Sequence, residues 1–146
     1  MNKYLFHLAI PINDIDSAKE FYGKILGCTI GRENQHAVIF NFYGHQLVGH
    51  TTKEELTPPA NIYPRHFGII FSAEGDWNEL LNRCNNLNLP LYQQPKLRFK
   101  GEITEHQTFF IQDPFYNIIE LKFYRHYEAI FGANNFGAIG DRGMEN

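Results

Sequence analysis

The sequence is poor in cysteine, in excess charge and in long hydrophobic runs. Its two cysteines, Cys28 and Cys84, have no CxxC spacing, so neither a disulfide framework nor a zinc knuckle is supported. Thirteen Lys and Arg against 16 Asp and Glu give a net charge of -3, which disfavours a nucleic-acid partner. The longest apolar run near the N-terminus, residues 4–12, is too short to span a membrane. We therefore expect a cytoplasmic protein whose partner is a small molecule, with no nucleic acid and no membrane involved.

An internal repeat organises the chain. Aligning His7 with His66, an offset of 59 residues, sets "HLAIPINDIDSAKEFYGKI" against "HFGIIFSAEGDWNELLNRC". In both copies a histidine opens an apolar strand, and a helix-start signature follows ten residues later. The two signatures are Ser17-x-x-Glu20 and Asp76-x-x-Glu79. Apolar residues then recur at helical spacing in both copies, so the repeat predicts two equivalent halves.

Three short strands follow each predicted helix, which makes each half a βαβββ module. We predict an α+β fold in which modules 1–55 and 56–126 together form one domain. Their sheets, laid edge to edge, would form a curved, half-open barrel of mixed strands with the helices outside. In the later strands the offset becomes 72, which sets Val48 opposite Glu120. Residues 127–146 are glycine-rich and are expected to be a mobile tail without chemistry.

Three residues of the predicted concave surface suggest a metal site. His7 and His66 begin equivalent strands, and Glu120 lies inside the apolar strand "NIIELKF", where a carboxylate is costly without a partner. Two imidazoles and one carboxylate form the set that suits iron(II) and leaves coordination positions open for substrate or dioxygen. Each residue taken alone also fits a structural role, since a strand histidine can bond a backbone carbonyl and a strand glutamate can face solvent.

The repeat and one motif resemble a known superfamily. The segment "DPFYNIIELKFY" is close to the pattern D-P-x-G-N-x-x-E-[LF], and the repeat covers residues 4–124. Both resemble the vicinal oxygen chelate superfamily, which includes glyoxalase I, extradiol dioxygenases, fosfomycin-resistance transferases and bleomycin-binding proteins. The segments "FHLAIPI", "YGHQLVGH" and "LRFKGE" are similar to a group of predicted extradiol-type dioxygenases. The resemblance implies that His7, His66 and Glu120 bind a divalent metal, with Fe(II) favoured and Zn, Ni, Co or Mn as alternatives.

The number of metal ligands separates the activities within this resemblance. Glyoxalase I proteins place a fourth ligand at the position of Val48, which cannot bind a metal. Gln46 and His50 lie two residues to either side on the same strand face, and His50 is preferred as a fourth ligand because imidazole binds metals better. A solvent-facing role for His50 is equally open. Tyr116 replaces the glycine usual in the turn before the last strand, where strain is expected.

Further residues are candidates for catalysis and substrate binding. His106 is a candidate acid or base, and Arg98 and Lys100 are candidates for holding an anionic oxygen, although all three also fit a solvated loop. The favoured function is an Fe(II) extradiol-type dioxygenase. The alternatives are a glyoxalase-type lyase or isomerase and a metal-free small-molecule-binding protein. Superfamily members pair their modules within one chain or across a dimer, and we expect a homodimer.

Overall fold

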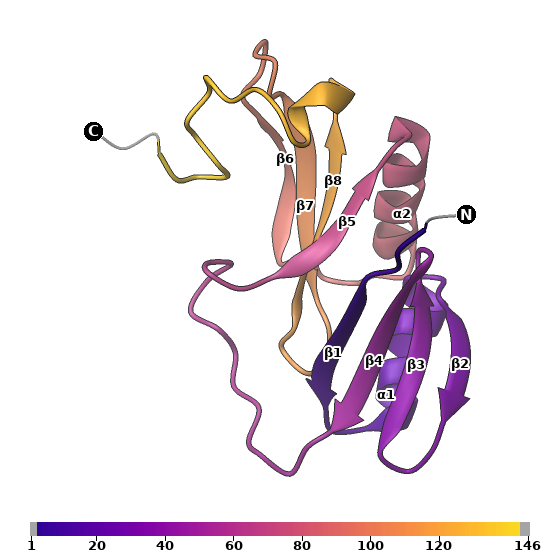
Figure 1. Ribbon diagram of the computed structural model, residues 1–146. Coiled ribbons are helices and arrows are strands. Elements are labelled where there is room, and N and C mark those ends of the chain that lie inside the picture. Colours follow the sequence, from indigo (N-terminus) through magenta and orange to yellow (C-terminus); the bar gives the residue numbers. More distant parts are fainter. Residues whose placement is uncertain (1–2, 144–146) are drawn as a thin grey trace.

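The computed structural model describes residues 3–143 and contains two successive βαβββ halves (Figure 1). The first half consists of β1 (His7–Ile12), α1 (Ile15–Ala18) continued by the π-helix η1 (Lys19–Ile25), β2 (Thr29–Glu33), β3 (Ala37–Phe42) and β4 (His45–Thr51). The second half consists of β5 (Phe67–Phe71), α2 (Glu74–Asn86), β6 (Gln93–Arg98), β7 (His106–Gln112) and β8 (Ile118–Tyr124), followed by the short 3-10 helix η2 (Tyr127–Ala129). The element order predicted from the repeat is confirmed. No helix among these residues is long and apolar enough to cross a membrane.

The strands form two four-stranded mixed sheets, which confirms the α+β class. Their orders are β1-β4-β3-β2 and β5-β8-β7-β6, and in each sheet the first strand runs parallel to its neighbour while the other pairs are antiparallel. The sheets curve but do not close into a barrel (Figure 1). Among residues 3–143 no strand of one sheet pairs with a strand of the other, so the predicted edge-to-edge junction is not made within the chain. Both β1 and β5 are left as edge strands.

Strand register confirms the internal repeat at the level of single residues. In the first sheet Ala9 of β1 lies opposite Val48 of β4, and in the second sheet Gly68 of β5 lies opposite Glu120 of β8. These pairs are related by the offsets of 59 and 72 that the sequence predicts. Because side chains alternate between the faces of a strand, His66 and Glu120 point to the same face, as do His7 and Val48.

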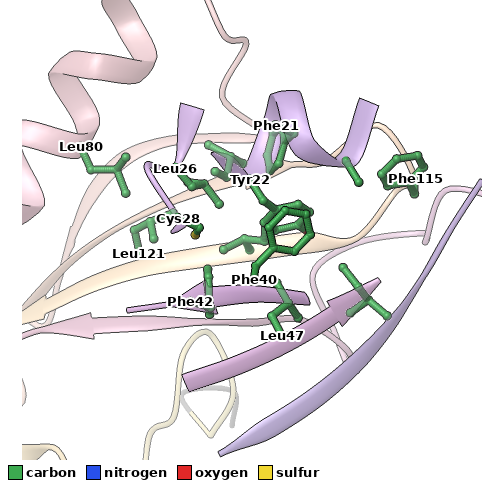
Figure 2. Packing of buried hydrophobic residues seen from close by; sticks show 14 of the residues in the cluster. Phe21, Tyr22, Leu26, Cys28, Phe40, Phe42, Leu47, Leu80, Phe115 and Leu121 are labelled. Atoms are coloured by element: carbon green, nitrogen blue, oxygen red, sulfur yellow. The ribbon is translucent and has the colours of Figure 1, made fainter. Parts of the chain in front are cut away.

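One hydrophobic core joins the two halves. Figure 2 shows Phe21, Tyr22 and Leu26 of the first helical segment among strand residues that include Phe40 and Leu121. The core also takes in buried residues of α2, namely Trp77, Leu80 and Cys84. Each helix covers one face of its own sheet, and in β1 the residues facing the core are buried while the alternate ones are exposed. The opposite faces are therefore free to carry a site.

The helix starts differ from the predicted capping pairs. The carboxylate of Asp14 accepts a hydrogen bond from the backbone N–H of Ser17 (3.2 Å), so α1 begins before Ser17. The second helix begins at Glu74 with no side-chain cap, and Asp76 lies in its first turn. The predicted starts were wrong because Asp14 reaches the first free amides ahead of Ser17, and because an acidic residue is also favourable inside the first turn.

The C-terminal segment also departs from the prediction. As far as residue 143 it packs against the second half, with the ring of Phe136 5.0 Å from that of Phe99. The carboxylate of Asp141 forms an ion pair with Arg98 of β6. The sequence predicted a mobile tail without chemistry and did not reveal this ion pair, because it joins residues far apart in the sequence.

Candidate metal centre

His66 and Glu120 meet on the free face of the second sheet. His66 directly precedes β5, Glu120 lies in β8, and His66 Nε2 is 3.0 Å from Glu120 Oε1. The other ring nitrogen, Nδ1, is 2.7 Å from the carbonyl oxygen of Ile62. A carbonyl can only accept, so Nδ1–H donates this bond and Nε2 is the nitrogen turned towards the carboxylate.

This geometry is explained by a proton on Nε2 of His66 or by a metal ion bound between the two side chains. With Nδ1 protonated, a neutral His66 ring would point the lone pair of Nε2 at a carboxylate oxygen 3.0 Å away, which is repulsive. Either a proton or a metal ion relieves that repulsion. Two neighbouring ligand atoms on an octahedral ion with bonds of about 2.1 Å are also roughly 3 Å apart, so the pair fits a divalent metal.

The surroundings of Glu120 hold its carboxylate in the ionised form that binds metals. Its second oxygen, Oε2, accepts a hydrogen bond of 2.6 Å from the hydroxyl of Thr108 in β7. Burial raises the pKa of Glu120, but the hydrogen bond from His66, the charge of Lys122 and the hydrogen bond from Thr108 outweigh it and leave the pKa below its ordinary value. The hydrogen bond to Glu120 raises the pKa of His66, partly opposed by burial.

His7 shows the same orientation on the first sheet. Its Nδ1 is 2.7 Å from the side-chain oxygen Oε1 of Gln46, the residue opposite it on β4. Because this oxygen accepts, Nδ1–H donates, and Nε2 is left as the nitrogen available on the exposed sheet face. Metal-binding histidines commonly have one ring nitrogen fixed in this way by an oxygen acceptor. Gln46 therefore orients His7 instead of reaching for a metal itself.

The three predicted ligands do not meet within one chain. Among residues 3–143 no group of three His, Cys, Asp or Glu side chains is close enough to hold a metal ion. His66 and Glu120 come together on the second sheet, whereas His7 lies on the first. A single chain thus places two of the predicted ligands together and the third elsewhere.

A cavity lies beside His66. Its volume of about 730 Å³ lies within the range of roughly 300–1,000 Å³ that is typical of small-molecule sites. Its walls include Pro11 of β1, Pro58 and Tyr63 of the linker, His66, and Tyr116 of the turn before β8. His66 therefore borders a space large enough for a small organic molecule.

Comparison with known proteins identifies the family. A family model described as the glyoxalase/bleomycin resistance protein/dioxygenase superfamily matches residues 4–121. The chain belongs to this superfamily. A glyoxalase/bleomycin resistance protein/dioxygenase from Alicyclobacillus acidocaldarius is 36% identical, with a TM-score of 0.82 over 88% of this chain and 97% of that one.

Two more distant structures share the superfamily fold. Lactoylglutathione lyase from Agrobacterium tumefaciens is 18% identical, with a TM-score of 0.66 over 90% of this chain and 98% of that one. A fosfomycin resistance protein from Listeria monocytogenes is 16% identical, with the same TM-score over 88% of this chain and 99% of that one. The superfamily includes metalloenzymes of several activities, so membership alone does not decide which reaction this chain performs.

The candidate fourth ligand, His50, lies away from the other predicted ligands. His50 is opposite Pro11 in the register of β1 and β4, whereas His7 is opposite Gln46. His50 lies four positions along β4 from Gln46, which corresponds to roughly 13 Å. Val48, the repeat equivalent of Glu120, is nearer to His7 but has no ligand atom. The geometry therefore favours three ligands over four.

The candidate catalytic residues lie further along the second sheet. His106 is buried and stacks on Tyr124, with ring centroids 4.6 Å apart. Its Nδ1 is 2.9 Å from the carbonyl oxygen of Thr104, and burial lowers the pKa of the ring. His106 lies opposite Tyr124, four residues along β8 from Glu120 and so about 13 Å from it. His106 is therefore not a direct neighbour of the His66–Glu120 pair. It lines a cavity further along the sheet.

Arg98 and Lys100 differ in environment. Arg98 is the last residue of β6 and is 5% exposed, so it is not the solvated loop residue that the sequence left as an alternative. Lys100 lies in the exposed loop that follows. Sequence reasoning did not find Thr108, which holds Glu120, because its role depends on the pairing of β7 with β8. The sequence offered one signal for Thr108, which is that it lies two residues after His106 and so on the same face of the same strand.

Proposed function

We propose that this chain is a divalent-metal-dependent enzyme that acts on a small substrate chelating through two adjacent oxygens, with an Fe(II) extradiol-type dioxygenase as the favoured activity. The observation that carries the proposal is the His66–Glu120 pair. His66 Nε2 and Glu120 Oε1 face each other at 3.0 Å. The carbonyl oxygen of Ile62 holds the other ring nitrogen of His66, and the hydroxyl of Thr108 holds the other oxygen of Glu120. When bound, a divalent ion supplies Lewis-acid polarisation of the substrate's oxygens.

The third ligand is His7 of a second copy of the chain. His7 lies on an exposed sheet face and is held by Gln46, with Nε2 available. His7 begins β1, and His66 directly precedes β5. Both strands are edge strands, and such edges are normally covered or paired. Leu5 and Phe6 just before β1 are each 63% exposed, which adds an apolar surface typical of an interface.

A homodimer accounts for these features together. Pairing β1 of one copy with β5 of the other joins the two curved sheets into the half-open barrel that a single chain does not form. The same pairing brings His7 of one copy towards His66 and Glu120 of the other, giving two sites for each dimer. Three ligands leave open positions for a bidentate substrate and, with iron, for dioxygen.

The ligand count favours a dioxygenase over a glyoxalase-type enzyme. Val48 occupies the repeat equivalent of Glu120 and cannot bind a metal, and His50 lies about 13 Å along the strand from the neighbour of His7. A glyoxalase-type lyase or isomerase needs a fourth ligand that this geometry does not provide. Such an enzyme would also act without oxygen.

Metal analysis of protein purified without oxygen tests the proposal. The wild-type protein is expected to retain about one iron per chain, and a panel of catechols is expected to include one that is cleaved with oxygen uptake. His66→Ala and Glu120→Gln should each lower metal affinity at least tenfold, because one of three ligands is lost. His36→Ala is the matched control, since His36 is an exposed histidine away from the pair.

Each remaining outcome contradicts part of the proposal. Metal binding with no cleavage of any catechol, together with lyase or isomerase activity under nitrogen, would favour the glyoxalase type. Equal metal content in wild-type, His66→Ala and Glu120→Gln proteins would overturn the proposed centre. Failure of every divalent metal to raise the melting temperature would leave a metal-free binding protein as the better account.

A further inference from the structure

Arg98 presents a buried positive charge on the sheet face that carries Glu120. Its side chain is 4% exposed, and its guanidinium makes a two-pronged ion pair with Asp141 of the C-terminal segment, Nη1 to Oδ1 and Nη2 to Oδ2 at 3.3 Å. The ammonium of Lys96 lies 3.2 Å from Oδ1, and the hydroxyl of Tyr63 donates to Oδ2 at 3.1 Å. Donors from three side chains thus converge on a single carboxylate.

Among residues 3–143, the anionic partner of Arg98 is Asp141 of the C-terminal segment. A buried guanidinium is costly unless an anion accompanies it. Glu120 lies on the same sheet face, but its two oxygens are engaged by His66 and Thr108. The Nε atom of Arg98 is buried and has no hydrogen-bond partner among the described residues. The guanidinium therefore has capacity for one more acceptor than Asp141 provides.

A short turn at the surface presents Asp141. A turn closed by two backbone hydrogen bonds between Ile139 and Arg142 presents the carboxylate, whose side chain is 45% exposed. The N–H of Asp141 donates to the hydroxyl of Tyr63 at 2.8 Å, and the guanidinium of Arg142 lies over the Tyr63 ring. Asp141 is open to water while Arg98 is not, so the carboxylate is the exchangeable member of the pair.

A cavity of about 490 Å³ lies between this segment and the sheet. Its sheet side is formed by His106, Lys122 and Tyr124, and its roof includes Phe136 and Ile139. Lys122 and Tyr124 follow Glu120 at alternate positions of β8, so they point to the same face as the metal pair. Gly140, the neighbour of Asp141, lines this space, and Lys122 places a positive charge in its wall, so an organic anion of modest size fits beside the ion pair.

We infer that Arg98, Lys96 and Tyr63 form a seat for the carboxylate of a small-molecule ligand, and that Asp141 occupies this seat until the ligand displaces it. The inference deepens the proposed function and rests on it for the role of this sheet face as a substrate surface. It assigns the ligand to organic acids that carry a second oxygen near the carboxylate, because Nε of Arg98 offers a further donor. The C-terminal segment then acts as a built-in competitor.

Calorimetric titration of the full-length, EDTA-treated protein with salicylate tests the seat, with phenol as the probe that lacks the carboxylate. Asp141→Asn is expected to bind salicylate roughly tenfold more tightly than wild type, because the internal competitor loses its charge. Glu128→Gln, which removes one charge from an exposed residue of η2, should match wild type. The double variant Arg98→Gln with Asp141→Asn should lose this gain in salicylate affinity. Phenol should bind all the variants with equal affinity.

Hydrogen exchange gives a second readout of displacement. Saturating salicylate should speed exchange of the Asp141 amide in the wild-type protein, since this N–H loses its bond to Tyr63. Unchanged exchange at saturation, equal salicylate affinity of Asp141→Asn and wild type, or no salicylate binding by Asp141→Asn would each overturn the inference. Because metal is absent throughout, failure of the proposed metal centre leaves these results unaffected and is detected separately by metal titration.

Discussion

At the scale of single residues, Gly68 couples the fold to the candidate site. It lies opposite Glu120 where β5 and β8 run side by side, and a Cβ atom built on Gly68 would be 1.8 Å from the carbonyl oxygen of Glu120. No side chain fits there without moving one strand away from the other. His66 lies two residues before Gly68, so the spacing of the two strands also sets the distance between His66 and Glu120.

Gly68→Ala is therefore expected to lower the free energy of unfolding by about 1–3 kcal/mol, since overpacking at a strand contact forces backbone shifts. Metal affinity should fall as well, because β8 carries Glu120. Urea unfolding and metal titration measure the two effects. Gly75→Ala is the matched control: nothing lies within 4 Å of its added Cβ, and an alanine inside α2 should leave stability equal or slightly higher. Equal stability of the two variants would contradict this account.

The residues predicted from the sequence and those missed differ in a physical way. His66 and Glu120 were recognisable because an ionisable side chain in an apolar strand needs a partner. Gln46 was noted only as a possible metal ligand and Thr108 not at all, since the contacts of these residues with His7 and Glu120 depend on strand register. The ligand role of His7, His66 and Glu120, and the catalytic role of His106, stay predictions.

At the scale of elements, one turn links the two halves. The carboxylate of Asp113 accepts hydrogen bonds from the backbone N–H groups of Phe115 and Asn117, both at 2.8 Å, and from the hydroxyl of Tyr22 at 2.6 Å. Tyr22 belongs to η1 of the first half, so this buried bond crosses between modules. Tyr116 in the same turn has φ of +69°, which agrees with the strain expected there from the sequence.

Tyr22→Phe tests this link without changing the shape of the core. The variant leaves Asp113 buried with one fewer donor, and burial already raises the pKa of this carboxyl. We expect a loss of about 1–3 kcal/mol in the free energy of unfolding, measured by denaturant titration. Tyr127→Phe, at a residue that is 72% exposed, should change stability by less than about 0.5 kcal/mol. A Tyr22→Phe protein as stable as wild type would show that the bond contributes nothing.

Element order was predictable because the repeat presents the same hydrophobic pattern twice, and agreement between two copies is stronger than one pattern alone. Helix starts were less predictable, as the cap at Asp14 shows. The position of the C-terminal segment was not predictable at all. It depends on Asp141 meeting Arg98 across the fold, and neither residue signals the other locally.

At the scale of the whole molecule, the account rests on a site shared between two chains. One chain brings His66 and Glu120 together and leaves His7 on the other sheet, and its two histidine-bearing sheets end in unpaired strands. In the proposed dimer, pairing of these edges would complete both sites at once. A monomer with two separate half-sites would hold metal only weakly.

Mixing two inactive variants tests this central claim most directly. His7→Ala and His66→Ala chains, each expected to lose metal as homodimers, are unfolded together, refolded in equal amounts and assayed for bound iron. In a shared-site dimer, each mixed dimer has one site with both histidines intact, so the mixture should recover about a quarter of the wild-type metal. No recovery in a mixture shown to contain mixed dimers would mean that each site is built within one chain, and would contradict the account.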